Sequence, residues 1–370
     1  MNNFISQLEI KNFKSIKELK LDCKRVNVFI GKPNVGKSNI LEVMSLLNPK
    51  NLSTENSEGA NIRFENFNEL HYDNEEKNNV QMSIQMNSHS EYKIDLFKLM
   101  KDYSEIEKGI YLTYQDITKL KSGSDIKSNS PNERDIIKSF WHYKLSDRGM
   151  EYQKNGYSKS LFSEKQLNDL FSIKKYEFRD SADRTLETLD ENFLLPLGQN
   201  LFDVVTNIES LKQKIVELFK NDYGLQFVFS KIDKKFFVQK LIDGYIYQYP
   251  YSSVADTFQR FIFYLAAIES NTNSILIFEE PEVHSFPPYV KELAERIVSK
   301  EDNQFFVSTH SPYMLQTLVE ELDDTELNVV LTYYKDYQTH VKVLSAAELR
   351  EVQDYSIDIF FNLNKFEPNA

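Results

Sequence analysis

The amino-acid sequence predicts an α/β fold with a mixed, largely parallel sheet at its centre. Three short apolar runs, at residues 26–30, 274–278 and 304–308, carry this prediction. Aliphatic and aromatic residues predominate in each run, as expected of a strand that is buried on both faces. Each is followed by a polar turn and then by a helical pattern, and strands that alternate with helices favour parallel pairing.

The other elements follow from periodicity and turn signals. Strands are expected at 4–10 and 16–21, and residues 80–86 alternate strictly, which indicates a strand at a sheet edge or in a ribbon. Asp243-Gly244 lies between two strand patterns and is a strong hairpin signal. A helix is expected after Ser38, ending before Asn48-Pro49. Further helices are expected at 200–221, 257–269, 288–299, 312–321 and 346–352, and further strands at 225–229, 235–241, 245–249, 327–333 and 340–344.

The chain is expected to divide into a head made of two parts and an insert between them. Residues 1–95 would form the first part, with a β-rich N-terminal lobe, and residues 200–370 the second. Residues 96–199 differ in composition, being rich in Lys, Asp, Ser and Tyr, and they contain a helix-like piece at 135–141. Their aromatic content indicates a packed, mainly helical subdomain rather than a disordered loop, because disordered segments are poor in aromatic residues.

Composition limits the classes of function. The 370 residues are 41% hydrophobic and 27% charged, which is typical of a globular protein with a sizeable core. The net charge of −12 argues against a surface that binds nucleic acid all over, although a local basic patch remains possible. A single cysteine, Cys23, excludes an internal disulfide and fits a reducing cytosol. The N-terminus lacks the pattern of a signal peptide, and no apolar run is long enough to span a membrane, so a cytoplasmic protein is expected.

The run at 26–30 leads into a phosphate-binding pattern, G-x-x-x-x-G-K-S, followed by a predicted helix. Backbone N–H groups of such a loop form a concavity for anions, and the start of the helix adds partial positive charge. Lys37 would reach the β- and γ-phosphates, and Ser38 would ligate Mg²⁺. The residues expected to contact the nucleotide are Gly31, Asn34, Val35, Gly36, Lys37, Ser38 and Asn39.

Polar residues follow the other two apolar runs. Glu279 and Glu280 end the second run, where the ligands of open α/β sheets bind. One carboxylate can hold Mg²⁺, and the next can orient or deprotonate an attacking water. Because paired acids repel each other, a cation or a shared proton is expected beside them. His310 follows the third run, where it could contact the γ-phosphate and the attacking water.

These pieces together resemble the ABC-type ATPase head of SMC, RecF and OLD proteins. Gly31 to Ser38 matches the Walker A motif, and Ile275 to Glu280 matches Walker B, with Glu279 in the usual place of Asp and Glu280 in that of the catalytic Glu. The sequence Glu279-Glu280-Pro281-Glu282-Val283-His284 is similar to the EEPExH form of OLD-like members, and Ser308 to Pro312 resembles their histidine switch. The resemblance covers residues 1–85 and about 200–345 and implies ATP and Mg²⁺ as ligands.

The resemblance also implies a homo-oligomer, at least a dimer, with ATP between two heads. In that group a Ser-Gly-rich signature of one head caps the γ-phosphate bound to the other. Here the matching stretch is 251–260, which has Ser253 as a candidate contact but lacks the signature glycine. Asp256 near that position would bring negative charge towards phosphate. After His284, Ser285-Phe286-Pro287 departs from the usual Leu-His-Pro, which puts an interface role of His284 in doubt.

Several functions remain open at this point. The loop also resembles that of Era-like GTPases, but Asn364-Lys365-Phe366-Glu367 lacks the Asp that reads guanine. Within the ATPases, one candidate is a stand-alone ATPase of a two-component antiphage defence system such as PARIS, acting on a separate effector such as a nuclease. Only 60 residues follow His310, too few for the nuclease domain of OLD proteins. The alternatives are a RecF-like DNA-repair ATPase, which the acidic balance does not favour, and an ATP-bound oligomeric scaffold with little hydrolysis.

Overall fold

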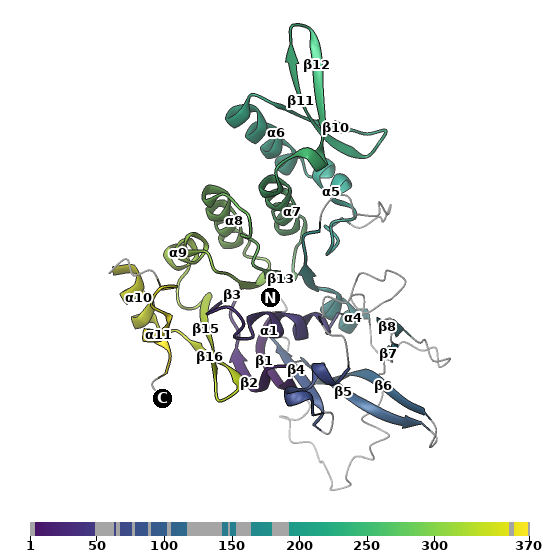
Figure 1. Cartoon of the computed structure of the whole chain (residues 1–370), viewed down its shortest axis with the longest axis vertical. Coiled ribbons are helices and arrows are strands. Elements are labelled where there is room, and N and C mark those ends of the chain that lie inside the picture. Colours follow the sequence, from purple (N-terminus) through teal and green to yellow (C-terminus); the bar gives the residue numbers. More distant parts are fainter. Residues whose placement is uncertain are drawn as a thin grey trace.

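A computed structural model shows three larger sheets and one two-stranded sheet in the described part of the chain, with helices packed around the central sheet (Figure 1). The structure describes residues 4–48, 63, 67–75, 78–87, 90–101, 105–116, 143–146, 149–152, 164–179, 192–354 and 359–368. Among these residues, no helix is both long and apolar enough to cross a membrane.

The central sheet has six strands in the order β16-β15-β3-β14-β13-β9. Five of them run parallel, and β16 pairs antiparallel with β15 at one edge. The sheet is therefore mixed and largely parallel, as predicted. Its strands are β3 (Val26–Ile30), β9 (Ile173–Tyr176), β13 (Ile275–Glu279), β14 (Gln304–Ser308), β15 (Leu327–Lys335) and β16 (Gln338–Val343).

The central sheet is covered on both faces, which explains the unbroken apolar runs of its strands. Along β13, Ile275 and Ile277 point into one core cluster, while Leu276 and Phe278 point into the other. The first cluster contains helix α1 (Lys37–Ser45) and the N-terminal strands. The second contains α7 (Asp256–Ser270), α8 (Pro287–Ser299) and α9 (Pro312–Glu321). Parallel sheets need such two-sided cover because neither of their faces is polar.

The second sheet is antiparallel and has the order β2-β1-β4-β5-β6. Its strands are β1 (Ile5–Phe13), β2 (Ile16–Asp22), β4 (Val80–Met86), β5 (Ser90–Lys101) and β6 (Glu105–Asp116). The β-rich N-terminal lobe is thus confirmed. The prediction of an edge for 80–86 was wrong, because β4 pairs with β1 on one side and with β5 on the other. Strict alternation shows only that one face is buried, and both edge and interior strands of an antiparallel sheet meet that condition.

The insert expected at 96–199 differs from the prediction within the described residues. The described part of the range contains β6, β7 (Tyr143–Ser146), β8 (Gly149–Tyr152), β9 and a single helix, α4 (Glu164–Phe171), so these described residues are not mainly helical. The expected boundary after residue 95 falls inside β5, and β9, which lies within the expected insert, belongs to the central sheet. The reason is long-range pairing, which extends the sheets into a stretch whose local composition suggested helix. The piece at 135–141 lies outside the described residues.

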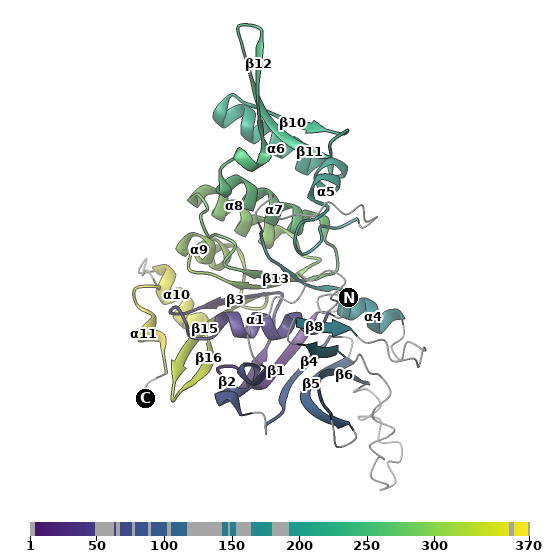
Figure 2. The same ribbon diagram turned by 45° about the vertical axis from the view of Figure 1, so that its right-hand side comes forward.

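The third sheet, β10 (Gln226–Ser230), β11 (Lys235–Ile242) and β12 (Tyr245–Pro250), projects from the end opposite the antiparallel sheet (Figure 2). Asp243 and Gly244 both have positive φ, so the predicted hairpin turn is confirmed. The helix expected at 200–221 is two helices, α5 (Leu201–Asn207) and α6 (Glu209–Tyr223), because Ile208 is extended. The C-terminal part adds α10 (Ala346–Asp354) and α11 (Leu363–Phe366) beside α9.

The core of the central sheet yields a test of stability. Phe278 is 1% exposed, and its ring lies 5.3 Å from that of Tyr264 and 5.9 Å from that of Tyr176, measured between centroids. Phe278→Ala should therefore lower the free energy of unfolding by about 3–5 kcal/mol, since the cavity cannot close fully. Phe361→Ala is the matched control, because Phe361 is 89% exposed. Urea denaturation measures both, and equal midpoints for the two variants would contradict this account of the core.

Candidate active site

The phosphate-binding loop connects β3 to α1 and has an unusual backbone. Gly31 and Gly36 have φ of 152° and 100°, and Asn34 has φ of 61°. Space also demands glycine at both ends of the loop. A Cβ on Gly31 would lie 2.1 Å from the carbonyl oxygen of Thr332, and a Cβ on Gly36 would lie 2.1 Å from Oγ1 of Thr339. The loop is therefore fixed by its own conformation and by close contact with β15 and β16.

A small hydrogen-bonded group holds the loop from below. Thr339 Oγ1 donates to the carbonyl of Val35 at 2.8 Å and lies 2.7 Å from the hydroxyl of Ser15. The Asn39 amide donates to that same Ser15 hydroxyl at 2.7 Å. Two of the predicted nucleotide-contacting residues, Val35 and Asn39, are thus engaged in shaping the loop, and Ser15 and Thr339 are supports that sequence reasoning missed.

Lys37 is folded back over the loop. Its side chain is buried, and Nζ donates to the carbonyls of Gly31 at 3.1 Å and Lys32 at 2.9 Å. Burial lowers the pKa of Lys37, and the nearby carboxylates of Glu280, Glu279 and Glu282 only partly oppose this. Because these are bonds to neutral carbonyl groups, Lys37 can exchange them for bonds to a phosphate that enters the loop.

Glu279 is the most densely paired carboxylate of the site. Lys175 Nζ lies 3.1 Å from its Oε2, and Arg63 Nη2 lies 3.3 Å from its Oε1. Burial would raise the pKa of Glu279, but Lys175, Ser38 and Arg63 together lower it. The carboxylate is thus kept charged beside the hydroxyl of Ser38, which is the pair of oxygen ligands predicted for Mg²⁺. A hard cation with few protein ligands fits such a donor set.

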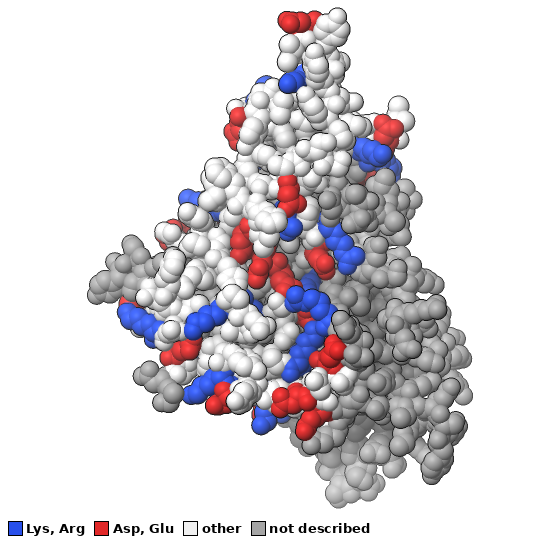
Figure 3. Space-filling model, in the orientation of Figure 1, with Lys and Arg blue, Asp and Glu red and all other residues white. Residues whose placement is uncertain are grey.

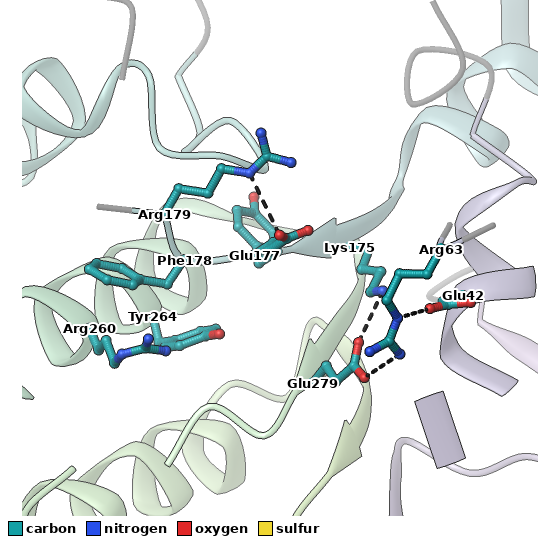
Figure 4. Close-up of a pocket in the computed structure, with 10 residues that line it drawn as sticks. Glu42, Arg63, Lys175, Glu177, Phe178, Arg179, Arg260, Tyr264 and Glu279 are labelled. Carbon is teal, nitrogen blue, oxygen red and sulfur yellow. Dashed lines mark hydrogen bonds and ion pairs between the residues drawn. The ribbon is translucent and has the colours of Figure 1, made fainter. Parts of the chain in front are cut away.

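A cavity of about 350 Å³ opens beside this carboxylate at the ends of β9 and β13 (Figure 4). Arg63 bridges Glu279 and Glu42, whose Oε1 lies 2.6 Å from Arg63 Nε, and Lys14 binds the second oxygen of Glu42. Glu42 is fully buried on α1, so these cations balance a charge that water cannot reach. Figure 4 shows two groups of side chains across the cavity, one around Glu279 and one around Arg260. The lining residues are Glu42, Arg63, Lys175, Tyr176, Glu177, Phe178, Arg179, Arg260, Tyr264 and Glu279.

Glu280 and His310 meet across the ends of β13 and β14. Nε2 of His310 lies 3.5 Å from Oε1 of Glu280. Glu280 has a left-handed backbone, with φ of 44°, and its N–H donates to the carbonyl of Ser308 at 3.0 Å. A non-glycine residue in this conformation is found where the surrounding structure imposes it, often at active sites. Burial and the charge of Lys37 lower the pKa of His310, and Glu280 opposes them.

The signature-like segment lies apart from the loop of its own chain. Ser253 belongs to the short 3-10 helix Tyr251–Ser253 at the foot of β12, where it is exposed. Among the described residues, no hydrogen bond or ion pair joins it to the loop at 31–38. Asp256 starts α7 and is bound on two sides, by Arg260 Nε at 2.7 Å and by His284 Nδ1 at 3.0 Å. Its charge is therefore balanced within its own chain.

The structure brings most of the predicted site together. Lys37, Ser38, Glu279, Glu280 and His310 meet at one edge of the central sheet, while Ser253 stands apart. Sequence reasoning missed the cations Lys175 and Arg63 and the buried Glu42. Lys175 carries no local signal in the sequence, because it lies in the short strand β9, whose pairing with β13 is not visible in the sequence.

Solved structures with a similar fold are ATPase heads of SMC proteins. One is an SMC head bound to the C-terminal winged-helix domain of ScpA, with 14% identity, a TM-score of 0.52, and coverage of 94% of this chain and 99% of that one. Another is an SMC head with an extended coiled coil, bound to the C-terminal domain of ScpA from Pyrococcus furiosus. It has 11% identity, a TM-score of 0.51, and coverage of 96% and 99%. At these identities the likeness establishes the fold alone.

No curated protein matches the sequence. A family model described as an AAA ATPase domain matches residues 4–315, which contain the phosphate-binding loop, both acids and the histidine. This match favours an ATPase over the GTPase alternative. Taken with the ABC-type head fold, it identifies the chain as a member of the AAA ATPase domain family, whose P-loop proteins hydrolyse ATP.

Proposed function

We propose that this chain is a Mg²⁺-dependent ATPase whose ATP-bound heads pair, and that the pairing controls a separate effector protein in bacterial antiphage defence. One observation carries the enzymatic part of this proposal. Ser38 lies close enough to Glu279 to help lower the pKa of its carboxyl group, while Glu280 and His310 face each other at the neighbouring strand ends. That arrangement provides oxygen ligands for a metal and an acid–base pair on the side where a γ-phosphate would lie.

In this proposal the loop N–H groups and Lys37 hold the phosphates. Lys37 would exchange its bonds to the carbonyls of Gly31 and Lys32 for bonds to phosphate oxygens, which are charge-assisted and stronger. Ser38 and Glu279 would hold Mg²⁺, which supplies charge stabilisation to the transferred phosphoryl group. Glu280 would orient the attacking water and take up its proton, and His310 would contact the γ-phosphate.

The proposed pairing of heads explains why Ser253 lies apart from the loop of its own chain. It is exposed beside the start of α7, so it is free to face the loop of a second copy. Asp256 does not oppose such an approach as strongly as the sequence suggested, because Arg260 and His284 bind its carboxylate. These observations support a dimer as the smallest active unit, with Ser253 as a contact across the interface.

The proposed effector needs a surface, and the projecting hairpin has the properties of one. Leu241, Tyr245 and Ile246 are 65%, 70% and 65% exposed, and the whole of β12 is uncovered. Figure 3 shows this end of the molecule as largely uncharged. Exposed apolar surface of this kind is typical of sites of protein contact. The defence role itself rests on the OLD-like sequence from Glu279 to His284.

The DNA-repair alternative has less support. Phosphate binding needs a gathered set of Lys and Arg side chains. On the face seen in Figure 3 acidic and basic side chains are interspersed instead, and the chain carries a net charge of −12. The scaffold alternative would require a site that binds ATP without hydrolysis, and it competes directly with the role proposed for Glu280.

Removal of the loop lysine tests the binding part of the proposal. Lys37→Ala should weaken ATP binding about tenfold to a hundredfold, because it removes charge-assisted hydrogen bonds worth about 1.5–3 kcal/mol in total. Lys32→Ala is the matched control, since Lys32 is in the same loop but exposed. Isothermal titration with ATP measures both affinities. If Lys37→Ala bound ATP as tightly as Lys32→Ala, the loop would not be the phosphate site.

Replacement of the proposed base tests the hydrolytic part. Glu280→Gln should keep ATP binding but lower turnover about 10²–10⁴-fold, because the amide cannot accept a proton. Since the trapped ATP would hold two heads together, light scattering after gel filtration with ATP should detect a dimer. Glu295→Gln, at an exposed position of α8, is the control. Turnover at the wild-type rate in Glu280→Gln would remove Glu280 from the mechanism, and binding without turnover in the wild type would favour the scaffold.

A further inference from the structure

Glu282 is a carboxyl-bearing residue beside the site to which the proposed reaction gives no role. It follows Glu280 by two residues, in the turn between β13 and α8. Its Oε1 accepts two hydrogen bonds, one from the Thr309 hydroxyl at 2.8 Å and one from the backbone N–H of His310 at 2.6 Å. One oxygen of Glu282 thus binds the two residues that directly follow β14, Thr309 and His310.

The second oxygen of this carboxyl group is in a different position. Oε2 of Glu282 is buried and has no hydrogen-bond partner among the described residues. Burial and the neighbouring charge of Glu280 raise the pKa of Glu282, although the bonds from His310 and Thr309 oppose them. A neutral carboxyl group would carry its proton on Oε2 and keep Oε1 as the acceptor, so the two bonds do not require a charge. Glutamine can provide the same acceptor.

The segment that Glu282 binds, Thr309 and His310, determines where the His310 side chain points. Its backbone is fixed at the Glu282 bond, and the next residue, Ser311, donates its N–H to Thr309 Oγ1 at 3.0 Å. Ser311 then caps α9, accepting from the Met314 N–H at 3.4 Å. On the other side, the N–H of Glu280 donates to the carbonyl of Ser308. The segment after β13 and the segment after β14 are therefore joined by two sets of hydrogen bonds, one at Glu280 and one at Glu282, and both sets lie close to His310 in the chain.

We propose that Glu282 is a positioning residue: by holding the Thr309 hydroxyl and the His310 amide, it keeps the His310 ring against Glu280. The proposal rests on the proposed function, in which Glu280 and His310 act on the attacking water and the γ-phosphate. A displacement of about 1 Å in a reacting group can cost a hundredfold in rate. Loss of Glu282 should therefore act on turnover, while the loop and Lys37, which bind the phosphates, are left in place.

The experiment compares five forms of the full chain with the wild type. Glu282→Ala removes both bonds, Glu282→Gln keeps the acceptor, and His310→Ala removes the positioned group. The double variant Glu282→Ala/His310→Ala asks whether Glu282 acts through His310, and Glu295→Ala on α8 is a matched control. Steady-state ATPase measurements give kcat and KM, and hydrogen exchange by mass spectrometry reports the amides of residues 305–316 without nucleotide.

Glu282→Ala should lower kcat about tenfold to a hundredfold with KM changed less than about twofold. Glu282→Gln should recover most of that loss, and Glu282→Ala should cause no further loss in the His310→Ala background. In the exchange experiment the His310 amide should lose its protection in Glu282→Ala, while the amides of α9 keep theirs. Glu295→Ala should match the wild type in every measurement.

The proposal is overturned if Glu282→Ala costs as much with His310 absent as with it present, or if Glu282→Gln is no better than Glu282→Ala. An unchanged exchange rate at His310 would overturn it as well. If Glu282→Ala does not fold, Thr309→Val, which removes one of the two bonds, takes its place in the same comparison. Absence of turnover in the wild type would instead refute the proposed function, and the exchange result would still decide whether Glu282 holds the segment.

Discussion

The register of three parallel strands determines where the chemistry of this protein can occur. Glu279 on β13 pairs with Ser308 on β14, and Ser308 pairs with Phe29 on β3. These residues lie at one level of the central sheet, so the segments that follow them leave it side by side. Gly31, Glu280 and His310 each come one or two residues later. A slip of one residue in either pairing would turn these side chains to the other face of the sheet and separate them.

Two-sided burial keeps that register. The alternation along β13 directs Ile277 towards α1 and Phe278 towards the helices on the opposite face. Packing therefore specifies which side chains of β13 lie on each face of the central sheet, and the strand cannot turn over without exposing apolar residues to a different core. The polar residues begin where this burial ends, since Glu279 is half-buried and Phe278 is not exposed. The end of β13 is therefore the first position along that strand at which a charged group is reachable from solvent.

Charge balance at those ends explains the part of the site that the sequence did not reveal. The phosphate-binding loop, the two acids and His310 were predictable because each is a local pattern after an apolar run. The cations were not, because Lys175 meets Glu279 across about a hundred residues and only the pairing of β9 with β13 brings them together. Thr339 supports Val35 across an even longer separation. The same limitation explains why the described residues of the expected insert contain more strand than helix, since strand pairing depends on distant partners and helical periodicity does not.

The turn from Glu279 to His284 joins more of the molecule than its length suggests. Glu279 lies near Ser38 of α1, which helps to lower its pKa, and is paired with Lys175 of β9, while Glu280 faces His310 beyond β14. At the far end of the turn, His284 contacts Asp256 through its ring and accepts from the Thr257 hydroxyl through its carbonyl, so it is tied to the start of α7. A displacement of α7 would therefore be transmitted through the short turn to the carboxylates of Glu279 and Glu280. Because only Val254 and Ala255 separate Ser253 from α7, the segment proposed to meet a second head is mechanically connected to the residues proposed to hydrolyse ATP in the first.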